Sequence, residues 1–545
     1  MNMLLRPFIR CYHRPVFTSP TPRRLFQWHR TLFFRSRLRL QPHSRCFSSL
    51  HDRQLNRDED TIFALSTPPG TSAIAIIRIT GSSSLDIYRS LTKSATPPRP
   101  RYAHVRPIHH PDTSTILDPG ALCLFFPASS SLTGSDTLEL HLHGSRAIIS
   151  AVLTALPLLS ARPADPGEFT KRAFHAGKLS LPEVEALGET LAAVTEQQRI
   201  RAIRGTSSHL ADRYDGWRVE LIEARGVLEA LIDFADDQGF EESPAELVGR
   251  TVSLAKELHT KLLIYTDNAV RGELLRSGIS LCFLGAPNAG KSSLLNRIVG
   301  REAAIVSPEA GTTRDVVDLA VDVGGYMLLL GDTAGLRSST TASGKIEIEG
   351  MRRARERVRA ADIVVAVFDV TEKIPEEVKD ALALAHQGKK KIIAVANKTD
   401  LLPGNSTTLD TSILADSILP SLPSDTPVIS LSCTTGTGIK TLLDTLTSLC
   451  SDLTSPLVAS GMSPLEAEES VAATQRQRGL LLQCKNALEE FVDMCDGNEE
   501  EADVVLAAEL LRDAAAALGK VVGRGEQGDV EDVLGVVFEK FCVGK

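Results

Sequence analysis

The 545-residue chain lacks the features that mark several specialised classes of protein. Its nine cysteines include no C-x-x-C pair, which argues against a zinc site or a disulfide framework and fits a reducing compartment. No stretch approaches the roughly 20 uncharged apolar residues of a membrane-spanning helix. Apolar residues make up 43% and charged residues 23%, so most of the chain can bury a core, and its length predicts several domains. Buried packing is expected for Cys123, Cys282 and Cys484.

The first 51 residues contain no Asp, Glu or Lys but ten Arg. An Arg-rich, Ser-containing, acid-free N-terminus is typical of a mitochondrial transit peptide, so we predict a transit segment over residues 1–50 and a location in the mitochondrial matrix. The segment Arg45–Ser48 resembles a processing site, which predicts a mature start near Ser48. A disordered basic arm that binds nucleic acid is the alternative. The remaining residues carry 50 basic against 68 acidic side chains, a net charge of -18.

A phosphate-binding loop follows an apolar stretch near the middle of the chain. The sequence ISLCFLG leads into GAPNAGKS at residues 285–292 and then into a helix start, SLLN. In this setting backbone NH groups close around phosphates, Lys291 reaches the outer phosphates, and Ser292 offers a hydroxyl to Mg²⁺. The strand before the loop and the helix after it make a chance match improbable, so we predict a nucleotide site here.

Two further segments have the order that a GTPase requires. GTTRD at 311–315 can supply the Thr313 hydroxyl to Mg²⁺. DTAG at 332–335 follows YMLLLG and can place Asp332 behind the metal and the Gly335 amide at the terminal phosphate. The next residue is Leu336, where Ras-like enzymes have a Gln that orients water, so hydrolysis needs another charge stabiliser and another water-positioning group.

The purine is selected by a fourth segment, NKTD at 397–400, which ends the apolar stretch KIIAVA. A carboxylate at Asp400 can accept from two donors on guanine and is mismatched against adenine, which indicates GTP. SCT at 432–434 can add backbone contacts to the base. The expected GTP-binding residues are Asn288, Ala289, Gly290, Lys291, Ser292, Ser293, Ser307, Thr312, Thr313, Asp332, Gly335, Asn397, Lys398, Asp400, Ser432, Cys433 and Thr434.

These motifs, together with DTIFALSTPPG, AIAIIRITG, LTGSDTLELHLHG, PGEFTKRAF and the terminal FCVGK, resemble the MnmE (TrmE) family of tRNA-modification GTPases. The resemblance runs from about Asp60 to Lys545. It implies a potassium ion that takes the place of an arginine finger, with ligands at Asn288, Ser307, Glu309 and Thr312. It also implies that Glu347, with Lys291, is catalytic and positions the attacking water. The neighbouring Glu349 leaves this register open, and the alternative is that both are exposed helix-start carboxylates.

The N-terminal part is expected to contain strands at 61–67, 73–80, 121–126 and 137–143. In the last of these, Leu138, Leu140 and Leu142 face one way while Glu139 and His141 face the other. The resemblance implies a tetrahydrofolate derivative bound by Arg78, Glu139, Lys178 and Lys545. A purely structural ion pair between Arg78 and Glu139 is the alternative. Ser135 and Ser145 depart from the family's usual residues beside this strand.

Helical patterns precede and follow the GTPase segment. A capping box at Ser180 and Glu183 opens the first, and apolar residues at helical spacing behind Asp529 mark the last. Each half would leave apolar faces bare, so we predict one helical-bundle domain interrupted by an inserted Ras-like P-loop GTPase domain, beside an N-terminal α+β domain. The expected ranges are 1–50 for the transit peptide, 56–177 for the folate-binding-like domain, 178–273 and 455–545 for the helical domain, and 274–454 for the GTPase domain.

The resemblance implies that the protein, as a homodimer with an FAD-containing partner, modifies C5 of the wobble uridine of mitochondrial tRNAs with a folate one-carbon unit. Cys542 in the tail is a candidate reactive thiol, or simply a structural chain-end cysteine. The acidic chain is unusual for binding tRNA, although an Arg-rich run at 352–359 could form a local basic patch or merely a solvated helix face. A ribosome-assembly GTPase without modification activity is the competing interpretation, but the helical patterns after residue 455 do not indicate a KH-type appendage.

Overall fold

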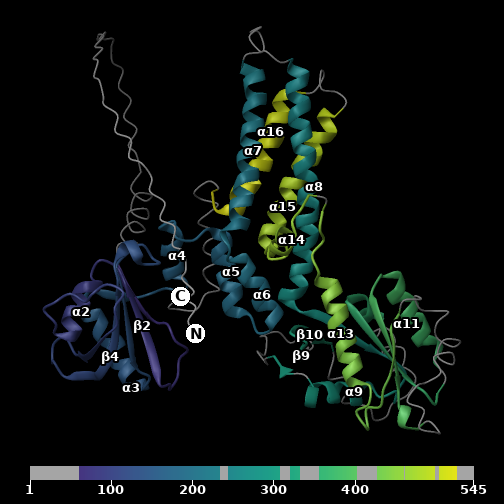
Figure 1. The fold of residues 1–545 in the computed structure, drawn as a ribbon, viewed down its shortest axis with the longest axis horizontal. Helices are drawn as coiled ribbons and strands as arrows, with labels where there is room; N and C mark the ends of the chain where they lie inside the picture. The colour runs from purple at the N-terminus through teal and green to yellow at the C-terminus, as the bar shows by residue number, and fades with distance from the viewer. Residues whose placement is uncertain are drawn as a thin grey trace, which may run out of the picture. The chain divides into compact units, whose positions relative to one another are not determined.

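A computed structural model describes residues 60–233, 243–302, 304–306, 319–331, 355–372, 374–401, 426–459, 461–496 and 503–524. These residues form three groups of elements: a mixed domain, a helical bundle, and a nucleotide-binding-type domain that interrupts the bundle in the sequence (Figure 1). None of the helices in the described ranges is long and apolar enough to cross a bilayer.

The N-terminal domain is a six-stranded sheet in the order β3-β4-β5-β2-β1-β6. All of its pairs are antiparallel except β1 with β6. Its elements are β1 (Thr61–Leu65), β2 (Ile74–Thr80), α2 (Ser84–Thr92), β3 (His104–His109), β4 (Ile116–Phe126), β5 (Thr137–His143), α3 (Arg146–Ala155), β6 (Ala161–Pro163) and α4 (Glu168–His175), with 3-10 turns at Ala128–Ser130 and Leu156–Leu159.

Alternation along the strands separates the two faces of this sheet. Leu138, Leu140 and Leu142 of β5 are buried in a core that also contains residues of α2 and α3, as the period-2 pattern predicts. Strand β4 begins at Ile116, five residues before the expected start at 121. Pro119 cannot donate to the ladder, and the strand continues past it through a register irregularity against β3.

The helical bundle is built from two segments of the chain, residues 181–277 and 464–522. Its elements are α5 (Leu181–Ala192), α6 (Glu196–Gly205), α7 (Ser208–Asp233), α8 (Pro244–Ser277), α14 (Pro464–Ser470), α15 (Gln475–Cys495) and α16 (Val504–Val522). One continuous core joins α7 and α8 to α15 and α16, so the apolar faces of the two halves cover each other (Figure 1). The capping box of Ser180 and Glu183 is present. The helix expected behind Asp529 lies outside the described residues.

The inserted domain lies in the sequence between α8 and α14. Its described residues form a sheet of seven strands in the order β13-β12-β11-β7-β10-β9-β8. Strands β10, β7, β11, β12 and β13 are parallel, and β9 and β8 are antiparallel additions. The elements are β7 (Ile279–Leu284), α9 (Lys291–Arg297), a π-helical turn (Ile298–Glu302), β8 (Ala304–Ile305), β9 (Leu319–Val323), β10 (Tyr326–Leu330), β11 (Ile363–Asp369), α11 (Glu376–Gln387), β12 (Lys391–Asn397), a 3-10 turn (Thr399–Leu401), β13 (Val428–Ser430) and α13 (Ile439–Thr454).

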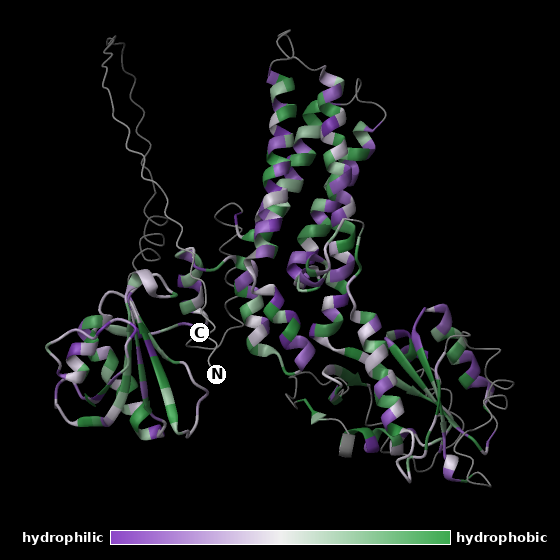
Figure 2. Cartoon of the chain, viewed as in Figure 1, coloured by the Kyte–Doolittle hydropathy of each residue, from purple (hydrophilic) through white to green (hydrophobic). Residues whose placement is uncertain are grey.

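The central strands of this domain are apolar except near their ends (Figure 2). They are buried on both faces, because two apolar clusters lie on opposite sides of the sheet. Polar side chains are therefore confined to the strand ends, which is where ligands bind in open α/β sheets. The three cysteines expected to be buried, Cys123, Cys282 and Cys484, are all buried.

Candidate functional site

The phosphate-binding loop connects β7 to α9, as the sequence predicts. Gly290 ends the loop with φ +101°, and a Cβ atom there would lie 2.0 Å from the Asn397 side-chain nitrogen. Asn288 also has a positive φ, +63°. Only glycine is compatible with both the backbone conformation and the close approach at position 290, so the loop is built to let backbone NH groups face a ligand.

Lys291 follows the loop, and its ammonium group points back into it. The Nζ atom donates to the carbonyl oxygens of Gly285 at 2.8 Å and Ala286 at 2.7 Å. Burial lowers the pKa of Lys291, since neither carbonyl supplies a full negative charge. The residues therefore fit a phosphate group, which would provide the missing charge. Ser292 and Ser293 occupy the first turn of α9, where hydroxyl groups can reach the same ligand.

The base end of the site is held by side chains from two loops. Asn397, at the end of β12, donates from Nδ2 to the Ala289 oxygen at 2.9 Å and accepts from the Cys433 amide at 3.2 Å. Ser432 donates to Asp400 Oδ1 at 2.6 Å. Among the described residues, the second carboxylate oxygen of Asp400 accepts no hydrogen bond, and the serine holds the carboxylate in one orientation. Thr434, the last of the expected base contacts, is exposed.

Sequence reasoning missed Asp369, which ends β11. It is 7% exposed and accepts from Lys398 Nζ at 2.5 Å and from the amide and hydroxyl of Thr371. Burial alone would raise the pKa of Asp369, but the hydrogen bonds from Lys398 and Thr371 outweigh it and hold that pKa below its usual range. The ion pair orients the Lys398 side chain. An acidic residue at the end of an otherwise apolar strand, IVVAVFD, was the signal that could have found it.

Seven expected nucleotide-site residues lie outside the described residues, as do two from the tail. They are Ser307, Glu309, Thr312, Thr313, Asp332, Gly335, Glu347, Cys542 and Lys545.

The second candidate site is the face of the N-terminal sheet opposite its core. Arg78 and Glu139 are direct partners in the β2–β5 ladder, and Arg78 Nε donates to Glu139 Oε1 at 3.0 Å. The Arg78 side chain is 30% exposed and the Glu139 side chain is 18% exposed. The Arg78 guanidinium also lies 5.9 Å from the ring centroid of Phe169 in α4.

His141 lies one step along the same face. Its Nε2 is 3.6 Å from Glu139 Oε2, and this buried nitrogen has no hydrogen-bond partner in the described part of the chain. A buried polar atom that lacks a partner is costly, and a ligand on this face could satisfy it. These residues therefore fit a polar heterocycle such as a pterin. Lys178, shortly after α4, is exposed and forms no hydrogen bond or ion pair with Arg78 or Glu139.

Comparison with known proteins yields matches over most of the chain. A family model described as "GTP-binding protein TrmE N-terminus" matches residues 61–178, and one described as "MnmE helical domain" matches residues 181–542. A Danio rerio protein named "5-taurinomethyluridine-[tRNA] synthase subunit GTPB3, mitochondrial" is 39% identical over 504 residues, which cover 89% of this chain and 93% of that protein. The "tRNA modification GTPase MnmE" of Parvibaculum lavamentivorans is 40% identical over 488 residues, covering 89% and 100%.

Among solved structures, a crystal structure of Aquifex aeolicus Era bound to GDP and AlF4⁻ is 25% identical and covers 31% of this chain and 56% of that chain, with a TM-score of 0.24.

Proposed function

Because this chain belongs to the MnmE family of tRNA-modification GTPases, we propose that it hydrolyses GTP to drive modification of C5 of the wobble uridine in mitochondrial tRNAs. The arrangement at the base end of the nucleotide site is the observation that carries this proposal. Ser432 orients Asp400, while Asn397 links the phosphate-binding loop to the base-binding loop. This arrangement suits a purine edge that offers two donors.

The nucleotide roles follow from the loop and the motifs. The Lys291 ammonium binds the outer phosphates, and the amides from Asn288 to Ser293 surround them. Mg²⁺ would be held by the hydroxyls of Ser292 and Thr313, with Asp332 behind it, and it supplies charge neutralisation at the phosphates.

Because Leu336 cannot orient water, a second cation and a separate carboxylate are needed. Asn288, with its unusual positive φ, would be one potassium ligand, together with Ser307, Glu309 and Thr312. Glu347 would position the attacking water.

The open face of the N-terminal sheet would bind a tetrahydrofolate derivative, which supplies the one-carbon unit. Glu139 would accept hydrogen bonds from the pterin, and Arg78, Lys178 and Lys545 would hold its acidic end. The buried Nε2 of His141 supports a ligand at this position. The alternative, an ion pair of Arg78 and Glu139 with no ligand, would leave that nitrogen unsatisfied.

The remaining parts of the proposal concern location and assembly. Relatives named mitochondrial, together with the Arg-rich first 50 residues, support import into the mitochondrial matrix. The Danio rerio relative is named as a subunit, which supports a partner protein, and we take that partner to contain FAD. We further propose that this chain forms a homodimer. Cys542 is a candidate thiol in the tail of the protein.

Deleting the gene and analysing nucleosides of mitochondrial tRNA by mass spectrometry tests the function. Loss of the C5 modification at the wobble uridine, restored by the wild-type chain but not by Asp400→Asn, is the expected result. Unchanged nucleosides together with defective ribosomal particles would instead favour the ribosome-assembly GTPase.

A further inference from the structure

The hairpin of β9 and β10 occupies a special place in the nucleotide-binding domain. In the sequence it lies between the two segments expected to sense the terminal phosphate, GTTRD before β9 and DTAG after β10, with Gly331 alone between β10 and Asp332. A shift in the pairing of β10 with β7 is therefore linked along the chain to the state of the nucleotide.

The first turn of α6 is bonded to this hairpin. The Gln197 amide donates to the Gly325 oxygen in the hairpin turn at 3.1 Å. Gly325 has φ +87°, and a Cβ there would lie 3.4 Å from Glu196 Cβ. The contact is close and is made by backbone groups, so a displacement of the hairpin turn would displace the first turn of α6.

Gln198, the next residue, is the centre of this junction. Its Oε1 accepts from the amides of Val194 at 2.9 Å and Thr195 at 3.2 Å, which caps α6. Its Nε2 donates to the Arg276 oxygen at 3.0 Å, in the last turn of α8, and lies 3.7 Å from Met327 Sδ in β10. One amide therefore joins α6 both to the hairpin and to the helix that leads into β7 and the phosphate-binding loop.

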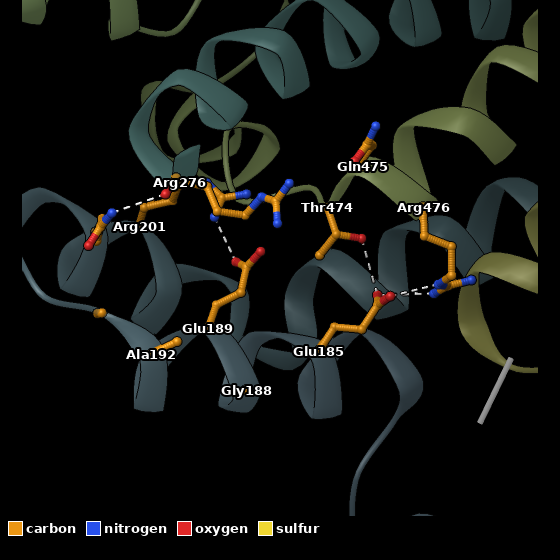
Figure 3. Close-up of a pocket in the computed structure, with 11 residues that line it drawn as sticks. Glu185, Gly188, Glu189, Ala192, Arg201, Arg276, Thr474, Gln475 and Arg476 are labelled. Carbon is orange, nitrogen blue, oxygen red and sulfur yellow. Dashed lines mark hydrogen bonds and ion pairs between the residues drawn. The ribbon is translucent and has the colours of Figure 1, made fainter. Parts of the chain in front are cut away.

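Behind this junction, residues of α5, α6, the end of α8 and the start of α15 line a cavity of about 560 Å³ (Figure 3). On one side of it Arg201 of α6 binds Glu189 of α5 at 2.6 Å, and on the other Arg476 binds Glu185 of α5 at 2.6 Å. Between these two ion pairs α5 carries Gly188, which also lines the cavity.

This construction ties α5 to its neighbours through directional polar bonds. The ion pairs of Glu189 with Arg201 and of Glu185 with Arg476 hold the helix on both sides of the cavity, so a shift of α6 is transmitted to α5. Helix α5 begins at Leu181, three residues after Lys178, and packs against α4, whose Phe169 lies by the guanidinium of Arg78. A shift of α5 can therefore reach the open face of the N-terminal sheet through α4.

We propose that Gln198 is a positioning residue that couples the β9–β10 hairpin to the folate-binding face through α6, α5 and α4. The inference rests on the proposed function, since it takes a tetrahydrofolate derivative as the ligand of that face. Coupling of this kind is reciprocal, so folate affinity depends on the bound nucleotide and nucleotide affinity depends on folate.

The test measures the dissociation constant of 5-formyltetrahydrofolate for the full mature protein by calorimetry, once loaded with GDP and once with a non-hydrolysable GTP analogue. We expect the two constants to differ by about fivefold or more in the wild type, a typical coupling. Gln198→Glu keeps the acceptor that caps α6 but loses the donor to Arg276 and Met327, so the two constants should converge to within about twofold while the GTPase rate and the thermal midpoint are retained.

Gln197→Ala is the matched control, because Gln197 bonds the hairpin through its backbone amide; its two constants should differ as in the wild type. A nucleotide-dependent difference that persists in Gln198→Glu overturns the proposal, and so does a wild type whose folate affinity ignores the nucleotide. In both of those cases the protein still binds folate and hydrolyses GTP, so the proposed function stands. If the protein binds no folate in either nucleotide state, the proposed folate role is wrong and the proposed coupling is wrong with it.

Discussion

Replacing Arg201 by Met should strongly destabilise the helical domain. Arg201 is 3% exposed. Its guanidinium donates to the carbonyl oxygens of Val471 at 3.0 Å, Ala472 at 3.3 Å and Ala473 at 3.0 Å, and to Glu189 Oε2 at 2.6 Å. Arg201 thereby joins the two halves of the helical domain, which the inserted domain separates in the sequence.

The cost follows from what Arg201→Met leaves behind. The Glu189 carboxylate, 18% exposed, loses its counter-ion, and three carbonyls lose their donor. Removing one partner of a buried ion pair costs about 3–5 kcal/mol. For a domain of this size each kcal/mol lowers the midpoint by about 2–4 °C, so a fall of roughly 6–20 °C is expected. The double variant Arg201→Met/Glu189→Gln removes the stranded charge and should recover about half of the loss, because the carbonyls remain unpaired.

The loss should also depend on pH. Burial raises the pKa of Glu189, against the opposing influence of Arg201. Because the folded state then holds the proton more tightly than the unfolded state, the contribution of Glu189 to stability is favourable at low pH and is lost as pH rises through the folded pKa. Without Arg201 this pKa rises further, so the penalty of Arg201→Met should be larger near pH 8 than near pH 5.

Intrinsic fluorescence can follow this domain alone. The chain has two tryptophans, and one lies in the first 50 residues. In a chain without that segment only Trp217 remains, which is 5% exposed in the helical core and has its ring centroid 4.9 Å from that of Tyr265. A variant midpoint within about 2 °C of the wild type, or an equal loss near pH 5 and pH 8, would refute the reasoning about the ion pair.

Three predictions concern the nucleotide site. Asp400→Asn should weaken GTP binding about 100-fold in calorimetry, because the loss of two hydrogen bonds to guanine costs roughly 3 kcal/mol. Equal affinity of the wild type for adenine and guanine nucleotides would contradict the assignment. Asn288→Ala should abolish the excess of the hydrolysis rate in KCl over that in NaCl; a wild type indifferent to potassium argues against the ion. Glu347→Ala should lower kcat about 100-fold with GTP affinity retained, whereas the control Glu349→Ala should leave kcat unchanged. If Glu349→Ala lowers kcat and Glu347→Ala does not, Glu349 positions the attacking water instead.

Short-range patterns account for the parts of the fold and site that the sequence alone predicts well. The phosphate-binding loop and the base-recognition residues come from contiguous segments at strand ends, whose chemistry is local. The alternation of Leu138, Leu140 and Leu142 with Glu139 and His141 places the core on one face of β5 without knowledge of its neighbours, because successive side chains of a strand point to opposite faces. The capping box at Ser180 is equally local. The insertion of one domain into another follows from the apolar helix faces that each half of the helical domain would leave exposed by itself.

Only the tertiary structure pairs the polar groups whose partners are distant in the chain. Nothing around Arg201 indicates that its donors meet carbonyls 270 residues later, and nothing around Gln198 indicates a contact with Met327, 129 residues away. Apolar residues obey a periodicity because they need only be turned away from water, whereas a buried guanidinium or amide needs particular partners at hydrogen-bond distance. Helix propensity and hydrophobic pattern therefore specify which elements form, and packing decides which charged and amide groups meet between them.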